Sequence, residues 1–553
     1  MTGEDVIKVW EQLKQKRSCM ESHWRELTEL YTPRRWDGDG AFDLMPLDDL
    51  YTSKPQQCAH IMANGLAATI APRTAPFYEF EPPDEIKDEE PVKVWFRESS
   101  EAAQQHTNSS NFYEEFGEFL LEFVIYGTAA LFCGDMDDRG EVFYKNQPIG
   151  SYCIAEDQYG RVNCFYRCIR RTAEQAAEEF GEDRLSEEIR EKLKRPEGKT
   201  EQFNFIHGVG KKMVSSKPNA PESASHPWYS FVVEEKTKAI VQEKSYHEFP
   251  FAVARYRREA NWPYGFGPGT VGRGDAKQVA FLNQMGDVGA ERQVFPPMVA
   301  PSSMEGEIAQ GPGEINYVDE NNPNQAASLR ELDVKSDLNA LQWRLESKES
   351  DLEAAFHVPL FTIFAQRAAE GKQPLTATEA NYIATEKIQQ FSPIYGRLMS
   401  ECMDVVLERL FNVLGRAGRF KPAPEALRDP KSKRVQSSVA IQYKNRIVLA
   451  LESLKNGSFL EFLNVAGAIF QLYPDALDHF DLDTAIPGMA RNASMPEEWI
   501  RKLRDVKAIQ AQRAKQRQAE MELMAATQAG KAAKDFSQAG PEAREAAGAA
   551  IRN

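Results

Sequence analysis

Cysteine and histidine are scarce in this chain of 553 residues, which holds seven cysteines and eight histidines. No two cysteines form a CxxC pair, and an odd number of scattered thiols is typical of reduced cysteines rather than of a disulfide framework. The tightest metal-like cluster is His479 with Asp481 and Asp483, and a polar turn between two helices explains it better than a metal site does. We therefore expect neither structural disulfides nor a bound metal.

Long apolar runs are also absent. The first residues, MTGEDVIKVWEQLKQ, contain acids and lack the apolar stretch of a signal peptide. The longest apolar stretch, 119–133, is interrupted by Glu122 and falls short of the roughly 18 apolar residues that a membrane span needs. These features predict a soluble, unsecreted protein with no membrane partner.

Most sequence motifs of enzymes are missing. The chain has no GxxxxGK[ST], no HExxH and no GxSxG, so the sequence predicts no ATP motor, zinc protease or serine hydrolase. One GxGxxG pattern, Gly267–Gly272, follows a strand and opens a helix, as in dinucleotide sites. However, REANWPY separates it from the strand, and no apolar parallel strand follows the helix. We expect a protein without enzymatic activity or cofactor, and the alternative is a soluble nucleotide-binding enzyme that uses the Gly267–Gly272 loop.

The charge balance is acidic, with 67 basic against 83 acidic side chains and a net charge of −16. Such acidity argues against a protein that holds nucleic acid over its whole surface, but it allows nucleic acid to slide past. One segment near the end is basic, and it is either a solvated helical face or a surface that faces phosphates. Its cations are Arg501, Lys502, Arg504, Lys507, Arg513, Lys515 and Arg517.

Hydrophobic periodicity predicts a mixed, α+β chain, whose length suggests about three to four domains. Helices are expected over 6–31, 55–70 and 112–131. Strands then dominate as far as residue 256, with a short helical insertion over 172–193. WYSFVVEE, KTKAIVQEK and FPFAVARY are expected to form one meander.

The second half of the chain shows unusually long helices. Helices over 268–293 and 329–357 are expected to flank a Pro-rich β tip, and the second carries an apolar seam at Leu338, Leu341, Leu345, Leu352 and Phe356. A further helix over 376–414 contains Pro393, which predicts a kink. The tail from Ala525 is expected to be frayed helix or disordered.

Several stretches, in this order and spacing, carry a resemblance to a known family. They are WRELTELYTPRR with LYTSKPQQCAHIMANGLAATIAP, then NWPYGFGPGTVGRGDAKQVAFLNQ, AQGPGEINYVD and PLTATEANYIATEKIQQFSPIYGRLMSECM. In these stretches the chain resembles the portal proteins, or head-to-tail connectors, of short-tailed bacteriophages. The resemblance implies a non-enzymatic ring, usually a dodecamer, at one capsid vertex, through which double-stranded DNA is packaged and ejected.

The resemblance also implies a portal-like fold with long stem and wing helices, a β-rich wing and clip, a helical crown and a C-terminal helix. Its segments in chain order would be a wing at 1–267, stem helix 268–293, clip 294–328, stem helix 329–357, channel loop 358–375, long wing helix 376–414, crown 415–505 and a helical tail 506–553 that forms a barrel or is disordered.

The implied partners are further copies of the chain, the DNA, the terminase packaging motor, the capsid and scaffolding proteins and a tail adaptor. The implied location is the portal vertex of the virion, with the host cytoplasm during assembly. Arg367 and Lys372 become candidates for contact with DNA in the channel, and Leu338, Leu341 and Leu345 become candidates for stem packing. The family carries an arginine just before the Thr-Ala-Thr-Glu step, where this chain has Lys372-Gln373-Pro374-Leu375.

Overall fold

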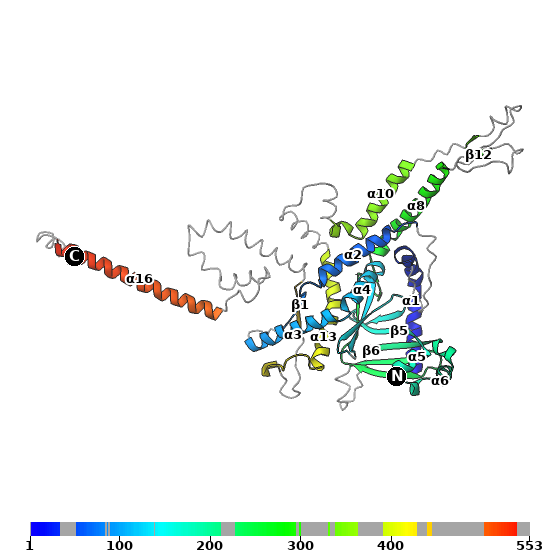
Figure 1. Cartoon of the computed structure of the whole chain (residues 1–553), viewed down its shortest axis with the longest axis horizontal. Helices are drawn as coiled ribbons and strands as arrows, with labels where there is room; N and C mark the ends of the chain where they lie inside the picture. Colours follow the sequence, from blue (N-terminus) through cyan, green and yellow to red (C-terminus); the bar gives the residue numbers. More distant parts are fainter. Residues whose placement is uncertain are drawn as a thin grey trace. The chain divides into compact units, whose positions relative to one another are not determined.

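The computed structural model divides the chain into two units, Met1–Ile447 and Val448–Asn553, and each is described by itself (Figure 1). It describes residues 2–33, 51–82, 86, 89–137, 139–211, 227–294, 298–299, 330–331, 338–362, 391–427, 439–444 and 503–538. Helices and antiparallel sheets both contribute to the first unit, so the chain is of the mixed class that its periodicity predicted.

The first unit begins with the long amphipathic helix α1 (Gly3–Tyr31). The Thr2 hydroxyl accepts from the amide of Asp5, and the Asp5 carboxylate accepts from the amide of Thr2, which satisfies free amides at the helix start. Helices α2 (Lys54–Ile70) and α3 (Glu90–Ser109) follow. The predicted helices over 6–31 and 55–70 are confirmed.

Helix α4 (Phe112–Tyr126) supplies much of the core. One face of it carries stacked, fully buried rings at three- and four-residue steps, from Phe112, Phe116, Phe119 and Phe123. The prediction that this helix continues to Leu131 is wrong. Gly127 has φ +75° and ends the helix, since a left-handed residue after the last turn is a common helix stop. The chain continues directly as strand β2 (Thr128–Met136).

Strand β2 is the centre of a three-stranded antiparallel sheet in the order β3–β2–β9, with β3 at Val142–Gln147 and β9 at Phe251–Arg255. The predicted meander of three strands is therefore wrong in its last member, because β9 leaves the strands before it and pairs with β2. All five residues of β9 are buried. The pairing with β2 and the contact with the helical turn Met399–Met403 together provide that burial.

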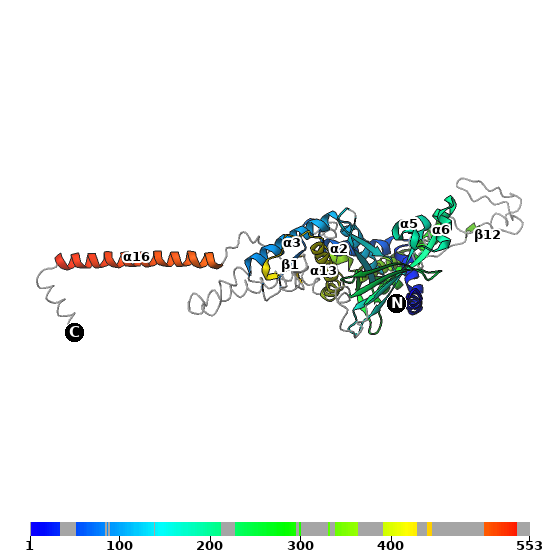
Figure 2. The same ribbon diagram turned by 90° about the horizontal axis from the view of Figure 1, so that it is seen from below.

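A five-stranded antiparallel sheet forms the other layer (Figure 2). Its strands in spatial order are β4 (Tyr152–Glu156), β5 (Val162–Thr172), β6 (Gln202–Lys211), β7 (Trp228–Glu234) and β8 (Ile240–Tyr246). Phe205 packs with the short helices α5 (Ala173–Phe180) and α6 (Glu187–Leu193), which confirms the predicted helical insertion. The next residue, Ile206, packs with the first turns of α1. Because neighbouring residues of a strand point to opposite faces, helices cover both faces of this sheet.

Shorter elements complete the first unit. Two-stranded pieces join β1 (Tyr78–Glu81) to β14 (Ala440–Tyr443), β10 (Arg257–Arg258) to β11 (Gly265–Phe266), and β12 (Met298–Val299) to β13 (Arg330–Glu331). The β12–β13 pair lies within the expected Pro-rich tip and just after it. Most of the expected clip, and the expected channel loop beyond residue 362, lie outside the described residues.

A helix described from residue 391 contains a π turn at Met399–Met403 and continues as α13 (Asp404–Arg416). The start of the predicted helix over 376–414 lies outside the described residues. In the second unit, α16 runs from Leu503 to Gln538, so helix extends well past Ala525. No helix in the described part of the chain is long and apolar enough to span a membrane.

Candidate functional site: the stem helices

Helix α8 (Arg273–Val294) and helix α10 (Leu338–Ala355) lie side by side and form a two-helix stem (Figure 1). The bounds of α8 fall close to the predicted helix 268–293. The prediction of a helix from residue 329 is wrong at its start, because Arg330 and Glu331 form strand β13 and α10 begins at Leu338. The stem begins at α7 (Pro268–Val271), which follows the glycine-rich loop.

The glycines of the loop permit close packing between α7 and the end of α4. A Cβ at Gly267 would lie 2.6 Å from the carbonyl oxygen of Val124, and a Cβ at Gly269 would overlap the carbonyl of Ile125. The amides of Thr270 and Gly272 are engaged in the first turn, donating to Gly267 O at 3.0 Å and to Pro268 O at 2.8 Å. A phosphate cradle needs such amides to be free, so the loop has the structural role rather than the nucleotide-binding one.

Leucines of α10 pack against glycines of α8. Leu341 lies 3.5 Å from the position of a Cβ at Gly286, and Leu338 lies 3.1 Å from that position at Gly289. Lower in the stem, Leu352 and Phe356 are buried next to Gly272. The structure places Leu338, Leu341 and Leu345 half-buried on α10, and the first two face α8 of the same chain.

Ion pairs tie the foot of the stem to the N-terminal helices. Lys348 lies 3.1 Å from Asp275 across the stem, and Lys54 of α2 lies 2.5 Å from Glu353. Glu26 of α1 forms ion pairs with Arg273 and Lys277, whose nitrogens lie 3.1 and 3.2 Å from its carboxylate oxygen. The hydrogen bond from Lys277 and the two positive charges hold the pKa of Glu26 below its usual value.

A histidine completes this junction. His23 contacts the Thr270 hydroxyl at 3.0 Å and the Arg273 guanidinium at 3.1 Å. Burial and the charge of Arg273 lower the pKa of His23, so the ring is neutral at neutral pH. The uncharged ring can then accept a hydrogen bond from Arg273.

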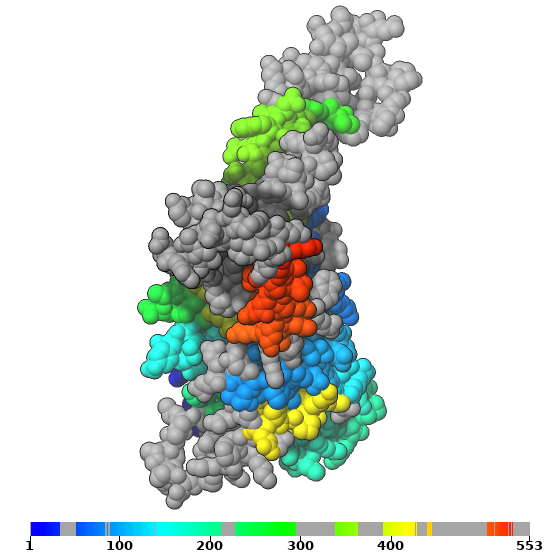
Figure 3. Space-filling view, turned by 90° about the vertical axis from the view of Figure 1, so that its left-hand side faces the viewer, coloured from blue at the N-terminus to red at the C-terminus, as the bar shows by residue number. Residues whose placement is uncertain are grey.

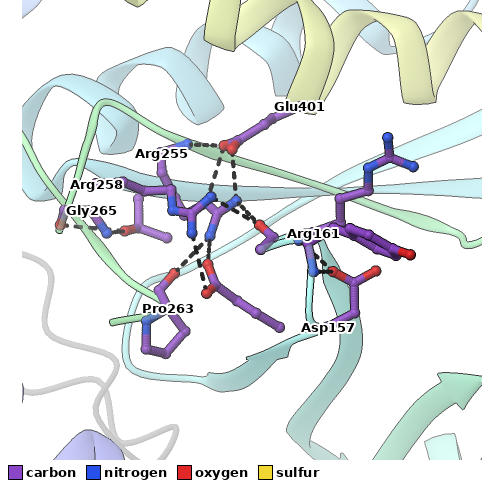
Figure 4. A network of polar contacts seen from close by, with 11 residues as sticks. Asp157, Arg161, Arg255, Arg258, Pro263, Gly265 and Glu401 are labelled. Atoms are coloured by element: carbon purple, nitrogen blue, oxygen red, sulfur yellow. Dashed lines mark hydrogen bonds and ion pairs between the residues drawn. The ribbon is translucent and has the colours of Figure 1, made fainter. Parts of the chain in front are cut away.

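A buried arginine joins distant segments of the first unit (Figure 4). Arg255, at the end of β9, donates to both carboxylate oxygens of Glu401, at 2.6 and 3.1 Å, and also contacts Glu156. It further donates to the carbonyl of Gly160 at 2.9 Å, and the same carbonyl also accepts a hydrogen bond from Arg258. One side chain therefore joins β9, the β4–β5 turn and the π turn that carries Glu401.

A second buried arginine acts in the same way on α13. Arg409 donates to the Cys133 carbonyl at 2.7 Å and to Asp135 at 2.9 Å, and lies 3.3 Å from Glu248. The sequence analysis missed both arginines, because their residue type and spacing do not distinguish them from surface cations. Their partners lie more than 90 residues away in the chain.

The predicted DNA-contact residues are only partly visible. Arg367, Lys372, Lys502 and Arg501 lie outside the described residues, as do His479, Asp481 and Asp483. Arg504 lies in α16, and the described side chains of α16 include four exposed predicted cations, Lys507, Arg513, Lys515 and Arg517. Within the part of the chain that the structure describes, no cluster of three His, Cys, Asp or Glu side chains could hold a metal ion.

Comparison with known proteins adds a family match. Residues 4–500 match the family model described as bacteriophage head to tail connecting protein. The chain is 24% identical over 525 residues to the portal protein of Salmonella phage epsilon15, covering 92% of each chain. It is also 24% identical over 529 residues to the probable portal protein of Bordetella phage BPP-1, covering 93% of this chain and 91% of that one.

Two solved structures are also similar. One is a chain from the virion of a native gene transfer agent particle, with a TM-score of 0.32, 10% identity and coverage of 76% of this chain and 88% of that chain. The other is from the neck of an empty gene transfer agent particle computed with C6 symmetry, with a TM-score of 0.34, 10% identity and coverage of 81% and 92%.

Proposed function

Since the chain belongs to the bacteriophage head-to-tail connecting protein family, we propose that it is a portal protein, a ring-forming structural protein of the virion. The ring stands at one capsid vertex and is the conduit through which double-stranded DNA enters and leaves. The observation that carries this proposal is the family match, which extends over residues 4–500. The portal protein of one bacteriophage and the probable portal protein of another, each aligned over more than nine-tenths of the chain, support it.

The parts of the ring follow from the element order. Residues 1–267 form the wing, 268–293 and 329–357 the stem, 294–328 the clip, 358–375 the channel loop, 376–414 the long wing helix, and 415–505 the crown, with the C-terminal tail at 506–553. The paired helices α8 and α10, with a two-stranded piece at their far end, support the stem and clip assignment. A compact two-helix stem suits a subunit that must fit between two identical neighbours.

The acidic charge suits a conduit. A protein that grips DNA makes many phosphate contacts, and each must be broken before the DNA moves on. With a net charge of −16 per chain, the ring as a whole repels DNA, and sparse cations at Arg367 and Lys372 of the channel loop make brief contacts. The basic part of α16 is a second candidate surface for phosphates.

The partners follow from this position in the virion. The ring contacts further copies of the chain, the capsid and scaffolding proteins, the terminase packaging motor and a tail adaptor. Assembly takes place in the host cytoplasm. The nucleotide-binding alternative loses its basis because the amides of Thr270, Val271 and Gly272 are engaged within their own helical turn, and the carbonyls of Val124 and Ile125 lie against Gly267 and Gly269.

Light scattering on the purified chain, with negative-stain images of the same fraction, tests the proposal. A dodecamer of the 62.5 kDa chain has a mass of about 750 kDa, and the images should show a central hole. A compact dimer or tetramer without a hole would contradict the portal assignment.

A further inference from the structure

Large apolar side chains stand exposed on the stem. Trp343 of α10 exposes 73% of its surface, and on α8 Phe281 exposes 58% and Met285 36%. Aromatic side chains of this size contribute strongly when they are buried, and tryptophan is enriched at the centres of protein interfaces. Much of α10 is open to view in the space-filling picture (Figure 3).

The two exposed patches are turned away from the α8–α10 contact. Leu341 marks the side of α10 that faces α8, and Trp343, two residues later, lies about 200° further round the helix. Gly286 marks the side of α8 that faces α10, and Phe281, five residues earlier, lies about 140° from it. The stem therefore carries one apolar patch on the outer side of each helix.

The patches also lie at the same level along the stem. Leu341 lies over Gly286 and Leu338 over Gly289, so the helices run antiparallel in a known register. Two residues beyond Leu341, Trp343 is level with residue 284, between Phe281 and Met285. A rotation about an axis along the stem does not change the level, so it can bring the α10 patch of one copy onto the α8 patch of the next.

We propose that Trp343 of one copy packs against Phe281 and Met285 of the neighbouring copy, and that this contact is the head-to-tail interface between stems. The inference rests on the proposed ring and names the surfaces by which its copies meet. Such a contact is heterologous, because each copy offers a different patch to each of its two neighbours. Heterologous contacts form a closed ring only when the rotation from one copy to the next divides a full turn. A dimer related by a two-fold axis would instead bring like patches together.

The residues around Trp343 leave room for a helix of the neighbouring copy to pack against it. The positions around it on the outer side of α10 are all exposed, and three of them carry small residues, Ala340, Ser347 and Ser350, while Asn339 and Glu346 are polar. Small neighbours leave the indole standing above the helix surface, so that a second helix can approach closely on both sides of it. The outer face of α8 offers a phenylalanine and a methionine, which are well suited to surround an aromatic ring.

Paired cysteines test the interface in the full chain. In a Cys19→Ser background, which removes an exposed native thiol, the variant carrying Phe281→Cys and Trp343→Cys is treated with a short bismaleimide. The chain concentration is set well above that at which the Trp343→Ala variant assembles, so that loss of the two side chains does not itself prevent assembly. We expect a ladder of covalent oligomers on a denaturing gel, because the two new thiols of one chain point away from each other but meet those of its neighbours. A mixture of the two single variants should give covalent dimers only.

The matched control replaces Phe281→Cys by Arg292→Cys, on the same outer side of α8. Arg292 lies eleven residues further along, which is about 16 Å at 1.5 Å per residue. This pair should give at least ten-fold less cross-linked product. Equal cross-linking of both pairs, or none in either, would overturn the proposed interface.

A tryptophan series supplies a second measurement. Trp343→Ala should raise the concentration at which half of the chains assemble by at least ten-fold, and Trp343→Phe should restore most of the assembly. If rings of the expected mass form while the cysteine pair stays uncross-linked and Trp343→Ala assembles normally, the interface is wrong and the portal assignment stands. If the unmodified chain forms no ring, the portal assignment fails and the interface fails with it.

Discussion

Buried charge is the main feature of this molecule at the scale of single residues. Arg17, Arg255 and Arg409 each expose only 1% of their surface. All three donate to carbonyl oxygens as well as to carboxylates, for example Arg17 to Tyr152 O at 2.9 Å and to Glu21 at 2.9 Å. A buried guanidinium is tolerated only when its donors are satisfied. These arginines therefore join distant segments with a directional requirement that apolar side chains lack.

We expect Arg255→Ala to lower the free energy of unfolding by about 3–5 kcal/mol, because Glu401 and Glu156 would lose their shared buried partner. Urea unfolding followed by circular dichroism measures the change. Arg73→Ala is the control, since Arg73 and Glu114 form an exposed pair at 3.5 Å, and its loss should cost at most about 1 kcal/mol. Equal effects of the two substitutions would contradict the structural role of Arg255.

Substituting alanine for either of two glycines near the foot of the stem should change the stability of the protein in opposite directions. A Cβ at Gly269 would overlap the carbonyl of Ile125, whereas a Cβ at Gly274 would have no atom within 4 Å. We expect Gly269→Ala to destabilise the protein by about 1–3 kcal/mol and Gly274→Ala to stabilise it by at most about 1 kcal/mol. Thermal unfolding measures both, and calorimetric titration should show that neither the original chain nor the variants bind NAD or ATP. Saturable nucleotide binding that Gly269→Ala abolishes would revive the enzyme alternative.

At the scale of elements, the stem depends on leucines that lie over glycines. Leu341→Asp replaces the apolar side chain that lies over Gly286 of α8 by a carboxylate. We expect a loss of about 1–3 kcal/mol in stability and loss of the assembled ring in light scattering. Arg344→Asp, at an exposed position of the same helix, should leave assembly intact. Normal rings from Leu341→Asp would show that this helix pair is not the stem.

The helix that contains the π turn carries a pH-sensitive carboxyl group. Asp404 accepts a hydrogen bond from the Tyr443 hydroxyl at 2.5 Å, and burial raises the pKa of Asp404 above its usual value of 3.8. A raised pKa in the folded state means that the folded chain holds this proton more tightly than the unfolded chain does. This group therefore reduces stability as the pH rises from about 3.8 through the folded-state pKa.

Asp404→Asn removes that ionisation and keeps an oxygen acceptor for Tyr443. We expect the variant to be more stable than the original chain at pH 7, with a gain that shrinks as the pH falls toward 4. Urea unfolding at the two pH values measures the difference. The control is Asp183→Asn, at an exposed position, and an Asp404→Asn gain that grows toward pH 4 would contradict the assignment.

At the scale of the whole molecule, function depends on repetition of weak contacts around a ring. An acidic chain with a net charge of −16 repels DNA on average, so any contact in the channel must come from local cations. Replacing both Arg367 and Lys372 by Ala should leave the ring mass unchanged while DNA retention in packaged particles falls several-fold, because transient phosphate contacts are lost. Arg73→Ala, which also removes an exposed positive charge but lies outside the proposed channel loop, is the matched control. Unchanged packaging and retention in the double variant would remove the channel-loop assignment.

Much of the helical part of the fold could be predicted because its cause is local. The apolar spacing of 6–31 and 55–70 corresponds to α1 and α2 within a few residues, and Pro33 lies just beyond the end of α1. Two of the errors arose where local pattern and wider structure disagree. The apolar run after Phe112 suits a helix throughout, and Gly127 divides it into α4 and β2. Strand β9 follows β8 in the chain but pairs with β2, more than 110 residues before it.

The sequence by itself determined the class of the chain, the places of helices α1 and α2 and its family, because apolar periodicity and the order of segments are properties of the chain alone. Only the tertiary structure decided that the glycines of 267–272 pack against α4, that Arg255 and Arg409 are buried, and that Trp343 is level with Phe281 on the outer sides of the stem. These facts depend on which distant segments come together. Burial, unlike periodicity, is set by neighbours that lie hundreds of residues apart in the chain.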